Sequence, residues 1–302
     1  MSPPTRSAAL PELRSASVAD IPAMLDVFFR AMEDLDQRRK RTVQPRNTGP
    51  LEQHFRHLLA TDHGSSVVAD DAGRVVAFGI LNVRGRRGFL SFLFVVPEWQ
   101  ARGLGRAVLA ECLRGAAGIE HLATCAEADQ PTSTGLYASL GMAPRVPIYL
   151  LRGALTDVSL PDLPDDLRTR AIQPDAVAAM DTELLDYERR VDHAFWFEHE
   201  RSGWMLETAG GELLGYGYAH RSGRLGPVAA RDPGYLPTLL GHLVRSTPVL
   251  EGWQLVVPGP AITALRPLLE AGMRIDGTAA IYCADDAGPR FDRYLPMSFA
   301  LL

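Results

Sequence analysis

Residues 90–113 read LSFLFVVPEWQARGLGRAVLAECL and predict a strand, a break at Pro97, a turn with two glycines and then a helix. The turn spans Gln100–Gly105, and the helical run Arg106–Leu113 follows it directly. Glycine has no Cβ, so the backbone N–H groups of such a turn can converge on one point. The start of the helix adds unpaired N–H groups and a partial positive charge. The segment therefore predicts an anion site, suited to the phosphates of a nucleotide-like cofactor.

Two better-known glycine patterns do not fit this turn. A Walker motif ends in Gly-Lys-Ser/Thr, and the turn contains no lysine. A dinucleotide fingerprint needs a third glycine or small residue at a fixed step, but Gly105 is followed by Arg-Ala-Val. What remains is Q-x-x-G-x-G behind a strand that ends in Val-Val-Pro. This combination resembles the pyrophosphate-binding motif of the GCN5-related N-acetyltransferases (GNAT).

Composition limits the classes of protein that remain. With 302 residues, 46% of them hydrophobic and 22% charged, the chain can form one large or two ordinary domains. No apolar run approaches the roughly 20 residues that span a bilayer, and the N-terminus lacks a hydrophobic signal core. We therefore expect a cytoplasmic protein with no membrane partner. Residues 1–155 carry 18 basic and 15 acidic side chains, whereas residues 156–302 carry 13 and 21. An anionic ligand thus belongs with the first half, and nucleic acid is not an expected partner.

The order of predicted elements recurs after a polar linker at residues 156–168. The same order is predicted for residues 1–155 and for residues 169–302: a first strand, then helices and further strands, and strands again at the end. The last strand is predicted at residues 297–302. The fold class we predict is α/β (α+β), with two GNAT-like domains in tandem. Each would be a mixed, mostly antiparallel sheet flanked by helices. Two unrelated α/β domains are the alternative.

The second half lacks the phosphate turn. Its corresponding segment, Ala229–Tyr235, is shorter and has one glycine in place of two. Asp232 falls where a helix is expected to begin, and a carboxylate there would cap the N–H groups itself and repel phosphate. We therefore expect residues 1–155 to bind the cofactor and residues 169–302 to form a degenerate domain without the pyrophosphate loop.

The resemblance implies an acetyl-CoA site in the first half. In this family the strand before the turn splays from a parallel neighbour, and the gap takes the pantetheine arm. Here the splayed strand would be Phe92–Val96 and its neighbour His121–Ala126. The residues that would bind the cofactor are Phe94, Val95, Val96, Gln100, Ala101, Arg102, Gly103, Leu104, Gly105, Arg106 and Ser133.

A second stretch strengthens the resemblance and implies a catalytic residue. The family commonly has N-x-x-A-x-x-L-Y-x-x-L-G-F after the neighbouring strand. Residues 130–142 read QPTSTGLYASLGM and keep the Leu-Tyr and Leu-Gly pairs. The tyrosine of this pattern often protonates the departing thiolate, which makes Tyr137 the candidate general acid. A packing role for Tyr137 is the alternative.

The general base is not marked by any motif. An amine nucleophile has to lose a proton, but Phe92–Val96 supplies no carboxylate. Glu127, at the end of the neighbouring strand, is one candidate. Glu33, Asp34 and Asp36 are others; they lie on the first helical segment, directly after the helix predicted at residues 19–32. A solvated surface charge is the simpler interpretation of each.

Together these patterns predict an N-acetyltransferase that moves an acetyl group from acetyl-CoA to a primary amine by direct attack in a ternary complex. The acceptor is a small molecule or a peptide amine, and the protein is a monomer or a homodimer. No metal is expected, because neither the cysteines nor the histidines have ligand spacing. A non-catalytic acyl-CoA-binding sensor or partner-binding protein and a transferase for another acyl group remain open. In the second half, residues 192–200 (DHAFWFEHE) are the best candidate for lining an acceptor pocket, with core packing as the simpler interpretation.

Overall fold

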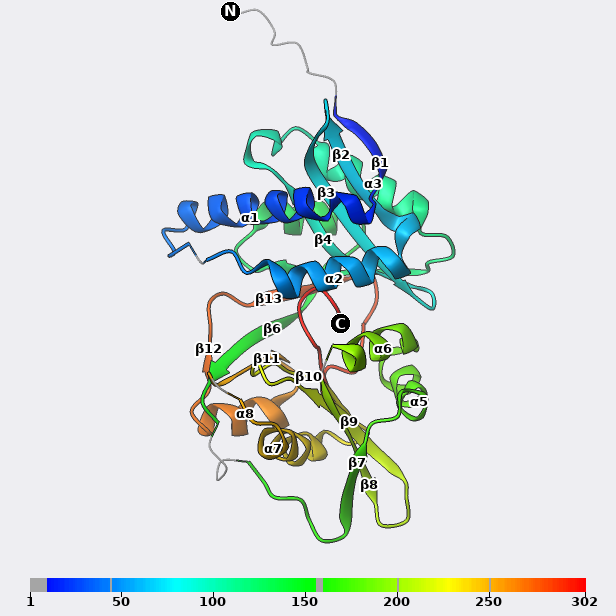
Figure 1. The fold of residues 1–302 in the computed structure, drawn as a ribbon, viewed down its shortest axis with the longest axis vertical. Coiled ribbons are helices and arrows are strands. Elements are labelled where there is room, and N and C mark those ends of the chain that lie inside the picture. The colour runs from blue at the N-terminus through cyan, green and yellow to red at the C-terminus, as the bar shows by residue number, and fades with distance from the viewer. Residues whose placement is uncertain (1–9, 44, 156–159, 200, 250) are drawn as a thin grey trace, which may run out of the picture. The chain divides into compact units, whose positions relative to one another are not determined.

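The computed structural model describes residues 10–43, 45–155, 160–199, 201–249 and 251–302 (Figure 1). Its contacts divide the chain into two compact units. Unit 1 comprises Met1–Val83 and Gly88–Ile119, and unit 2 comprises Arg84–Arg87 and Glu120–Leu302. This division differs from the domains expected from a duplication, which stay a prediction. Of the expected linker, residues 156–159 lie outside the described residues, and residues 160–166 form no helix or strand.

Unit 1 is a sheet with helices on both faces. Its strands lie in the order β1, β2, β3, β4, and its helices are α1, α2 and α3. The bounds are β1 Glu12–Ser15, β2 Ser66–Asp71, β3 Arg74–Arg84, β4 Arg87–Val95, α1 Ile21–Arg38, α2 Thr48–Thr61 and α3 Leu104–Gly115. The strand and helix predicted for residues 90–113 are therefore present as β4 and α3, with a short 3₁₀ turn at Pro97–Trp99 between them.

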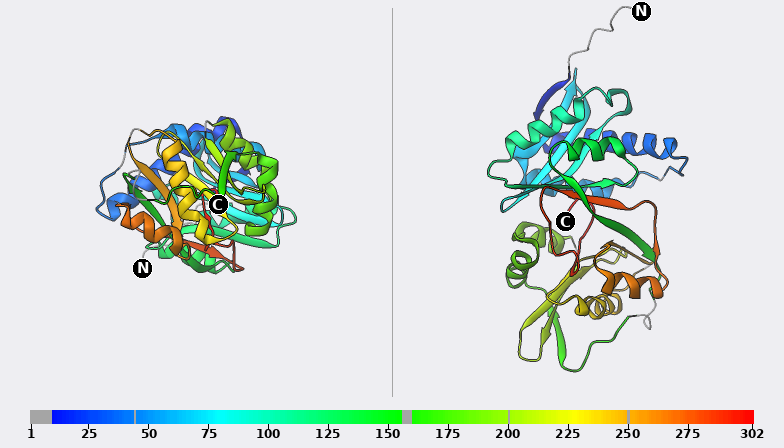
Figure 2. Two further views of the ribbon diagram at one scale, coloured as in Figure 1. Left: turned by 90° about the horizontal axis from the view of Figure 1, so that it is seen from below. Right: turned by 180° about the vertical axis from the view of Figure 1, so that it is seen from behind.

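Successive residues of β3 point to opposite faces of this sheet. Phe78 packs against Phe55 of α2, with ring centroids 5.3 Å apart, and Phe55 also meets Phe92 of β4 at 4.9 Å. The next residue, Gly79, points to the opposite face, where a Cβ would come within 2.9 Å of the Val108 side chain on α3. Glycine at this position thus lets α3 approach the sheet closely (Figure 2).

The first helix is longer than predicted. The sequence predicted a helix at residues 19–32, whereas α1 runs to Arg38. Its last turns are amphipathic and include an i,i+4 ion pair of 2.8 Å between Asp34 and Arg38, which supports the extra length.

The start of α1 is fixed by Asp20. Its carboxylate accepts two hydrogen bonds from the Arg14 guanidinium, at 2.7 and 2.9 Å, and one from the Ser17 backbone N–H at 2.8 Å. The bonds from Arg14, opposed by burial and aided by Ser17, lower the pKa of Asp20 from 3.8 to about 2.

We expect Asp20→Asn to lower the free energy of unfolding by about 2 kcal/mol at neutral pH. Because the folded-state pKa of Asp20 is depressed, its contribution is complete well above pH 3.8 and disappears as the pH falls toward 2. Urea unfolding of both proteins between pH 7 and 2.5 measures this difference. Asp71→Asn, at an exposed carboxyl, is the control. A difference that stays constant with pH would contradict the assignment.

Unit 2 contains two sheets. The first has the strand order β5, β13, β6, β11, all antiparallel, with β12 also paired to β6. The bounds are β5 His121–Glu127, β6 Ala143–Gly153, β11 Trp253–Pro258, β12 Arg274–Ile275 and β13 Ala280–Ala284, with α4 at Pro131–Ala138. A strand from the end of the chain, β13, thus pairs with two strands that precede the linker. The predicted splay would separate β4 from β5; these strands belong to different units, so the splay stays a prediction.

The second sheet has the order β14, β10, β9, β8, β7. The bounds are β7 Leu167–Ala171, β8 Ser202–Thr208, β9 Leu213–Ala219, β10 Leu225–Ala230 and β14 Tyr294–Leu295, with helices α5 Pro174–Leu185, α6 Arg190–Glu198, α7 Leu236–Ser246 and α8 Ile262–Glu270. Tyr216 and Tyr218 of β9 meet His193 of α6 on one face. On the other face, the Cβ position of Gly217 lies 2.7 Å from Leu243 of α7.

The strand that closes this sheet is not the one that was predicted. We expected a strand at residues 297–302, but those residues form none, and β14 lies a few residues earlier. In β14, Tyr294 and Leu295 pair with Ala229 and Val228 of β10. The apolar pattern of the last residues instead reflects burial, because Leu301 and Leu302 are both buried. Among the described residues, no helix combines the length and apolarity needed to cross a membrane.

Candidate active site

The turn in which the sequence predicts an anion site lies in unit 1, directly before α3. Helix α3 begins at Leu104, and Gly103 before it is in the left-handed conformation, with φ of 82°. No side chain caps this helix, and nothing lies within 4 Å of where a Cβ on Gly103 would be. The first N–H groups of a helix have no carbonyl partner within it, so those of α3 are available to a ligand at its start. The arrangement suits an anion with several oxygens.

The turn before α3 is held in place by the glutamine of the motif. The side-chain amide of Gln100 donates a hydrogen bond to the backbone carbonyl of Val95 at 3.0 Å, which ties the turn to the end of β4. Ala101 has φ of 59°, so two residues of this turn adopt left-handed conformations. These conformations reverse the chain sharply and bring successive N–H groups to one side.

Two arginines border the turn. The guanidinium of Arg102 lies over the ring of Trp99, 5.2 Å from its centroid, and the side chains of Arg102 and Arg106 are exposed. Phe94 and Val95 are half-buried, while Val96 and Leu104 are buried. The cofactor residues predicted between 94 and 106 therefore run from the end of β4 to the first turn of α3, and the side chains of Val96 and Leu104 belong to the core.

In unit 2 a carboxylate cap is present as the sequence predicted, on the 3₁₀ turn before α7; the start of α7 itself has no side-chain cap among the described residues. The carboxylate of Asp232 accepts a hydrogen bond from the Gly234 N–H at 2.7 Å, at the start of the 3₁₀ turn Pro233–Tyr235 that leads into α7. One N–H that could meet an anion is thus satisfied by the chain's own negative charge. The Asp232 cap is confirmed.

The remaining predicted site residues, Ser133, Tyr137 and Glu127, lie in unit 2. Tyr137, on α4, is 6% exposed, and its hydroxyl forms a hydrogen bond with the side chain of Thr124 on β5. Burial is the main reason that the pKa of Tyr137 is raised. Ser133 and Glu127 are half-buried. The loop and Tyr137 belong to different units, so a single site that includes both stays a prediction.

Glu33, one of the candidate bases, forms an ion pair with Arg46. Both of its carboxylate oxygens accept hydrogen bonds from Arg46, at 2.7 and 3.0 Å, and these bonds lower the pKa of Glu33. A carboxylate with a lowered pKa is a weaker base. Asp34 is paired with Arg38. Neither arrangement favours proton abstraction.

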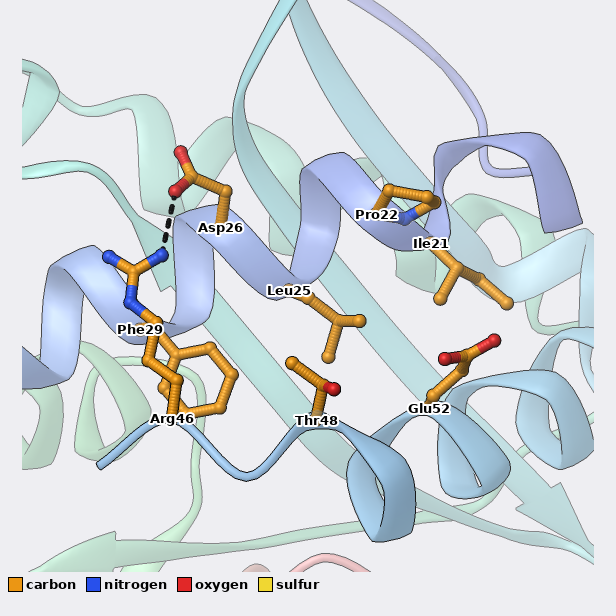
Figure 3. A pocket seen from close by; sticks show the side chains of 8 residues that line it. All are labelled: Ile21, Pro22, Leu25, Asp26, Phe29, Arg46, Thr48 and Glu52. Atoms are coloured by element: carbon orange, nitrogen blue, oxygen red, sulfur yellow. Dashed lines mark hydrogen bonds and ion pairs between the residues drawn. The ribbon is translucent and has the colours of Figure 1, made fainter. Parts of the chain in front are cut away.

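A depression lies beside this ion pair, between α1 and α2 (Figure 3). Its volume is about 270 Å³, and Ile21, Leu25 and Phe29 form its apolar floor. Arg46 lies at one end, over the ring of Phe29 and 3.1 Å from Asp26. No sequence pattern predicts this depression, because its lining comes from the start of α1 and from residues 46–52.

A buried polar network in unit 2 was also not predicted. Arg189 Nε donates to Asp181 Oδ2 at 2.9 Å, and the other guanidinium nitrogens reach the hydroxyls of Tyr294 at 2.6 Å and Tyr216 at 2.8 Å. His193 lies 2.7 Å from Asp181. None of these side chains is accessible to solvent. Such residues are normally exposed, and only the fold brings them together.

Contacts with this network bury part of the segment 192–200. His193 and Trp196 are fully buried, whereas Phe197 is 59% exposed. Asp192, His193, Phe195 and Trp196 therefore belong to the core, whereas Ala194 is exposed and Glu200 lies outside the described residues. Core packing accounts for these four side chains, and an acceptor pocket lined by the rest of the segment stays a prediction.

One group of side chains in unit 2 has ligand atoms close enough for a metal ion. Atoms of His121, Asp285 and Asp286 lie within 4.8 Å of one another. Asp286 already forms an ion pair with Arg87 at 2.6 Å, and Asp285 accepts a hydrogen bond from the Leu122 N–H at 3.0 Å. The guanidinium supplies the positive charge that a metal would bring, so the group is explained as an ion-pair cluster.

Comparison with known proteins identifies the fold. Residues 29–142 match the model of the Acetyltransferase (GNAT) family. The search of curated proteins found no match.

Solved structures extend the similarity to nearly the whole chain. A protein from Pyrococcus horikoshii, provisionally described as an acetyltransferase, has a TM-score of 0.77 at 16% identity, covering 96% of this chain and 95% of that one. A GCN5-related N-acetyltransferase from Sphaerobacter thermophilus has a TM-score of 0.61 at 17% identity, covering 93% and 98%. A tandem GNAT protein from the clavulanic acid biosynthesis pathway has a TM-score of 0.58 at 18% identity, covering 92% and 99%.

At these identities the likeness concerns the fold, and it confirms the predicted fold class. Residues 29–142 thus match the acetyltransferase (GNAT) family model, and the chain as a whole has a mixed α/β fold like that of the tandem GNAT protein.

Proposed function

We propose that this protein moves the acetyl group of acetyl-CoA to a primary amine by direct attack within a ternary complex. The observation that carries the proposal is the start of α3, where left-handed Gly103 leaves the helix without a side-chain cap and the space in front of it open. Gln100–Arg106 would hold the pyrophosphate, and the backbone of Phe94–Val96 would bind the pantetheine arm. Ser133 would contribute from α4.

Each catalytic role follows from the chemistry of thioester aminolysis. When bound, acetyl-CoA supplies a thioester whose carbonyl carbon can accept the amine nitrogen. Tyr137 would give its hydroxyl proton to the departing sulfur. Its hydroxyl is protonated at neutral pH, as a proton donor must be, and burial raises its pKa further. Glu127 would take the proton that the amine loses.

A non-catalytic acyl-CoA-binding protein is the second candidate. The observation that favours it is the pairing of Glu33 with Arg46, which removes one of the candidate bases. Both candidate functions require CoA to bind at the loop Gln100–Arg106, but only the transferase would turn over acetyl-CoA. Thiol release from acetyl-CoA against a panel of primary amines distinguishes them, and propionyl-CoA and succinyl-CoA in the same assay test the acyl preference.

We expect Tyr137→Phe to reduce the rate of thiol release by about a hundredfold while the Kd for CoA stays unchanged, because only the proton donor is lost. Steady-state kinetics and calorimetry measure the two quantities. Tyr235→Phe, at a partly buried tyrosine of the second half, is the control.

Unchanged turnover in Tyr137→Phe would overturn the general-acid role of Tyr137, but the proposed transferase activity would still stand. CoA binding without turnover on any amine would favour the sensor. Failure of the wild-type protein to bind CoA would overturn both.

A further inference from the structure

Two arginines meet at one end of the second sheet of unit 2. Arg201 directly precedes β8 and Arg224 directly precedes β10, with β9 between these strands. The first residues of β8 and β10, Ser202 and Leu225, both pair with Ala219 of β9. Residues that pair across antiparallel strands lie on the same face, so the register brings both arginines to the same end and the same face of the sheet.

Side-chain geometry agrees with this register. Arg201 Nη1 donates a hydrogen bond of 3.2 Å to the carbonyl of Gly226, which is two residues from Arg224. Burial, together with the positive charge of Arg224, lowers the pKa of Arg201 from 12.5 to about 10. Burial also lowers the pKa of Arg224 to about 10, with a contribution from Arg152. Both side chains remain cations at neutral pH, and they repel each other.

No negative charge compensates this pair within the described residues. Elsewhere in unit 2 the buried arginines are neutralised, Arg87 by Asp286 at 2.6 Å and Arg189 by Asp181 at 2.9 Å. Arg201 and Arg224 form no ion pair in the part of the chain that the structure describes, and only cations and Tyr218 affect their pKa values. Removing a charge from water without a partner is costly, so an arrangement of this kind gains stability when an anion binds.

We propose that Arg201 and Arg224 form a binding site for a doubly charged oxyanion, of which phosphate is the simplest. Guanidinium groups present paired N–H donors that match phosphate and carboxylate oxygens, and a dianion balances both positive charges. Both side chains keep partial access to solvent, so a ligand can reach them. The site is separate from the loop at Gln100–Arg106 and does not rest on the proposed acyl transfer.

Calorimetric titration of the full chain with inorganic phosphate tests the site, with malonate as the dicarboxylate and chloride as the monovalent reference at constant ionic strength. We expect Arg201→Gln and Arg224→Gln each to weaken phosphate binding by about tenfold or more, because a charge-assisted hydrogen bond is lost. Arg274→Gln removes the same charge from an exposed position and should leave binding unchanged. The dianion that binds with the lower Kd, phosphate or malonate, identifies whether the site prefers a phosphate or a dicarboxylate.

If Arg201→Gln and Arg224→Gln bind phosphate as tightly as the wild type, the proposed site is wrong. It is also wrong if Arg274→Gln loses as much phosphate affinity as these two variants do. Thermal unfolding gives an independent measurement. In chloride, Arg224→Met should melt above the wild type because it removes the repulsion, and phosphate should reduce or reverse this advantage by stabilising only the wild type. A variant that melts below the wild type in chloride and gains equally from phosphate would contradict the proposal.

Discussion

Replacing Arg189 with methionine is expected to lower the free energy of unfolding by about 3–5 kcal/mol. The change removes the cation but leaves the Asp181 carboxylate buried among apolar and phenolic groups. Burial alone would raise the pKa of Asp181, and Arg189 together with His193 holds it below its usual value. Urea unfolding followed by fluorescence measures the effect, since buried Trp196 lies over the Arg189 guanidinium, 4.9 Å from it.

The neighbouring arginine provides a matched control. Arg190 has a side chain that is 55% exposed, so Arg190→Met makes the same chemical change in water and should cost less than about 0.5 kcal/mol. Adding Asp181→Leu to Arg189→Met should recover stability, because no unpaired charge is then buried. Equal costs for Arg189→Met and Arg190→Met would show that the network contributes little.

Replacing Gly103 with aspartate is expected to raise the Kd for CoA by about a hundredfold or more, because it places a carboxylate where the pyrophosphate would bind. The substitution introduces a carboxylate cap of the kind that Asp232 provides for the 3₁₀ turn before α7. Aspartate is a favourable N-cap residue that tolerates the left-handed conformation, and the position has space for a side chain, so the fold should be retained. Calorimetric titration with CoA measures the change.

Gly103→Asn separates charge from capping. Asparagine has the same size, caps helices equally well and also tolerates left-handed geometry, but it is neutral. We expect it to cost about tenfold in Kd, and the difference between the two variants should shrink at high salt. If asparagine and aspartate weaken CoA binding equally, or if neither weakens it, then the start of α3 is not the pyrophosphate site.

The features that the sequence predicted correctly depend on residues that are close together in the chain. Strand, turn and helix at residues 90–113 follow from glycine placement and apolar periodicity, and the Asp232 cap follows from the preference of aspartate for helix starts. The end of α1 was placed too early because charged residues after Met32 look like a loop, although they pair along the helix.

The features that the sequence did not reveal depend on distant residues. Asp181, Arg189 and Tyr294 form one network across more than a hundred residues, and each alone resembles a surface side chain. The same holds for Arg201 and Arg224, which only the register of three strands brings together. Residues 297–302 resembled a strand because burial and strand formation favour the same apolar residues.

The position of β13 has a consequence for how the gene can change. Residues 280–284 lie between β5 and β6, so a segment encoded after the linker completes a sheet encoded before it. Copies that fold separately can be shuffled, lost or replaced one at a time. Here a recombination event at the linker would leave β5 and β6 without their shared partner, exposing two unpaired strand edges. Each half of the chain therefore depends on the other for a complete sheet, although only the first contains the phosphate turn.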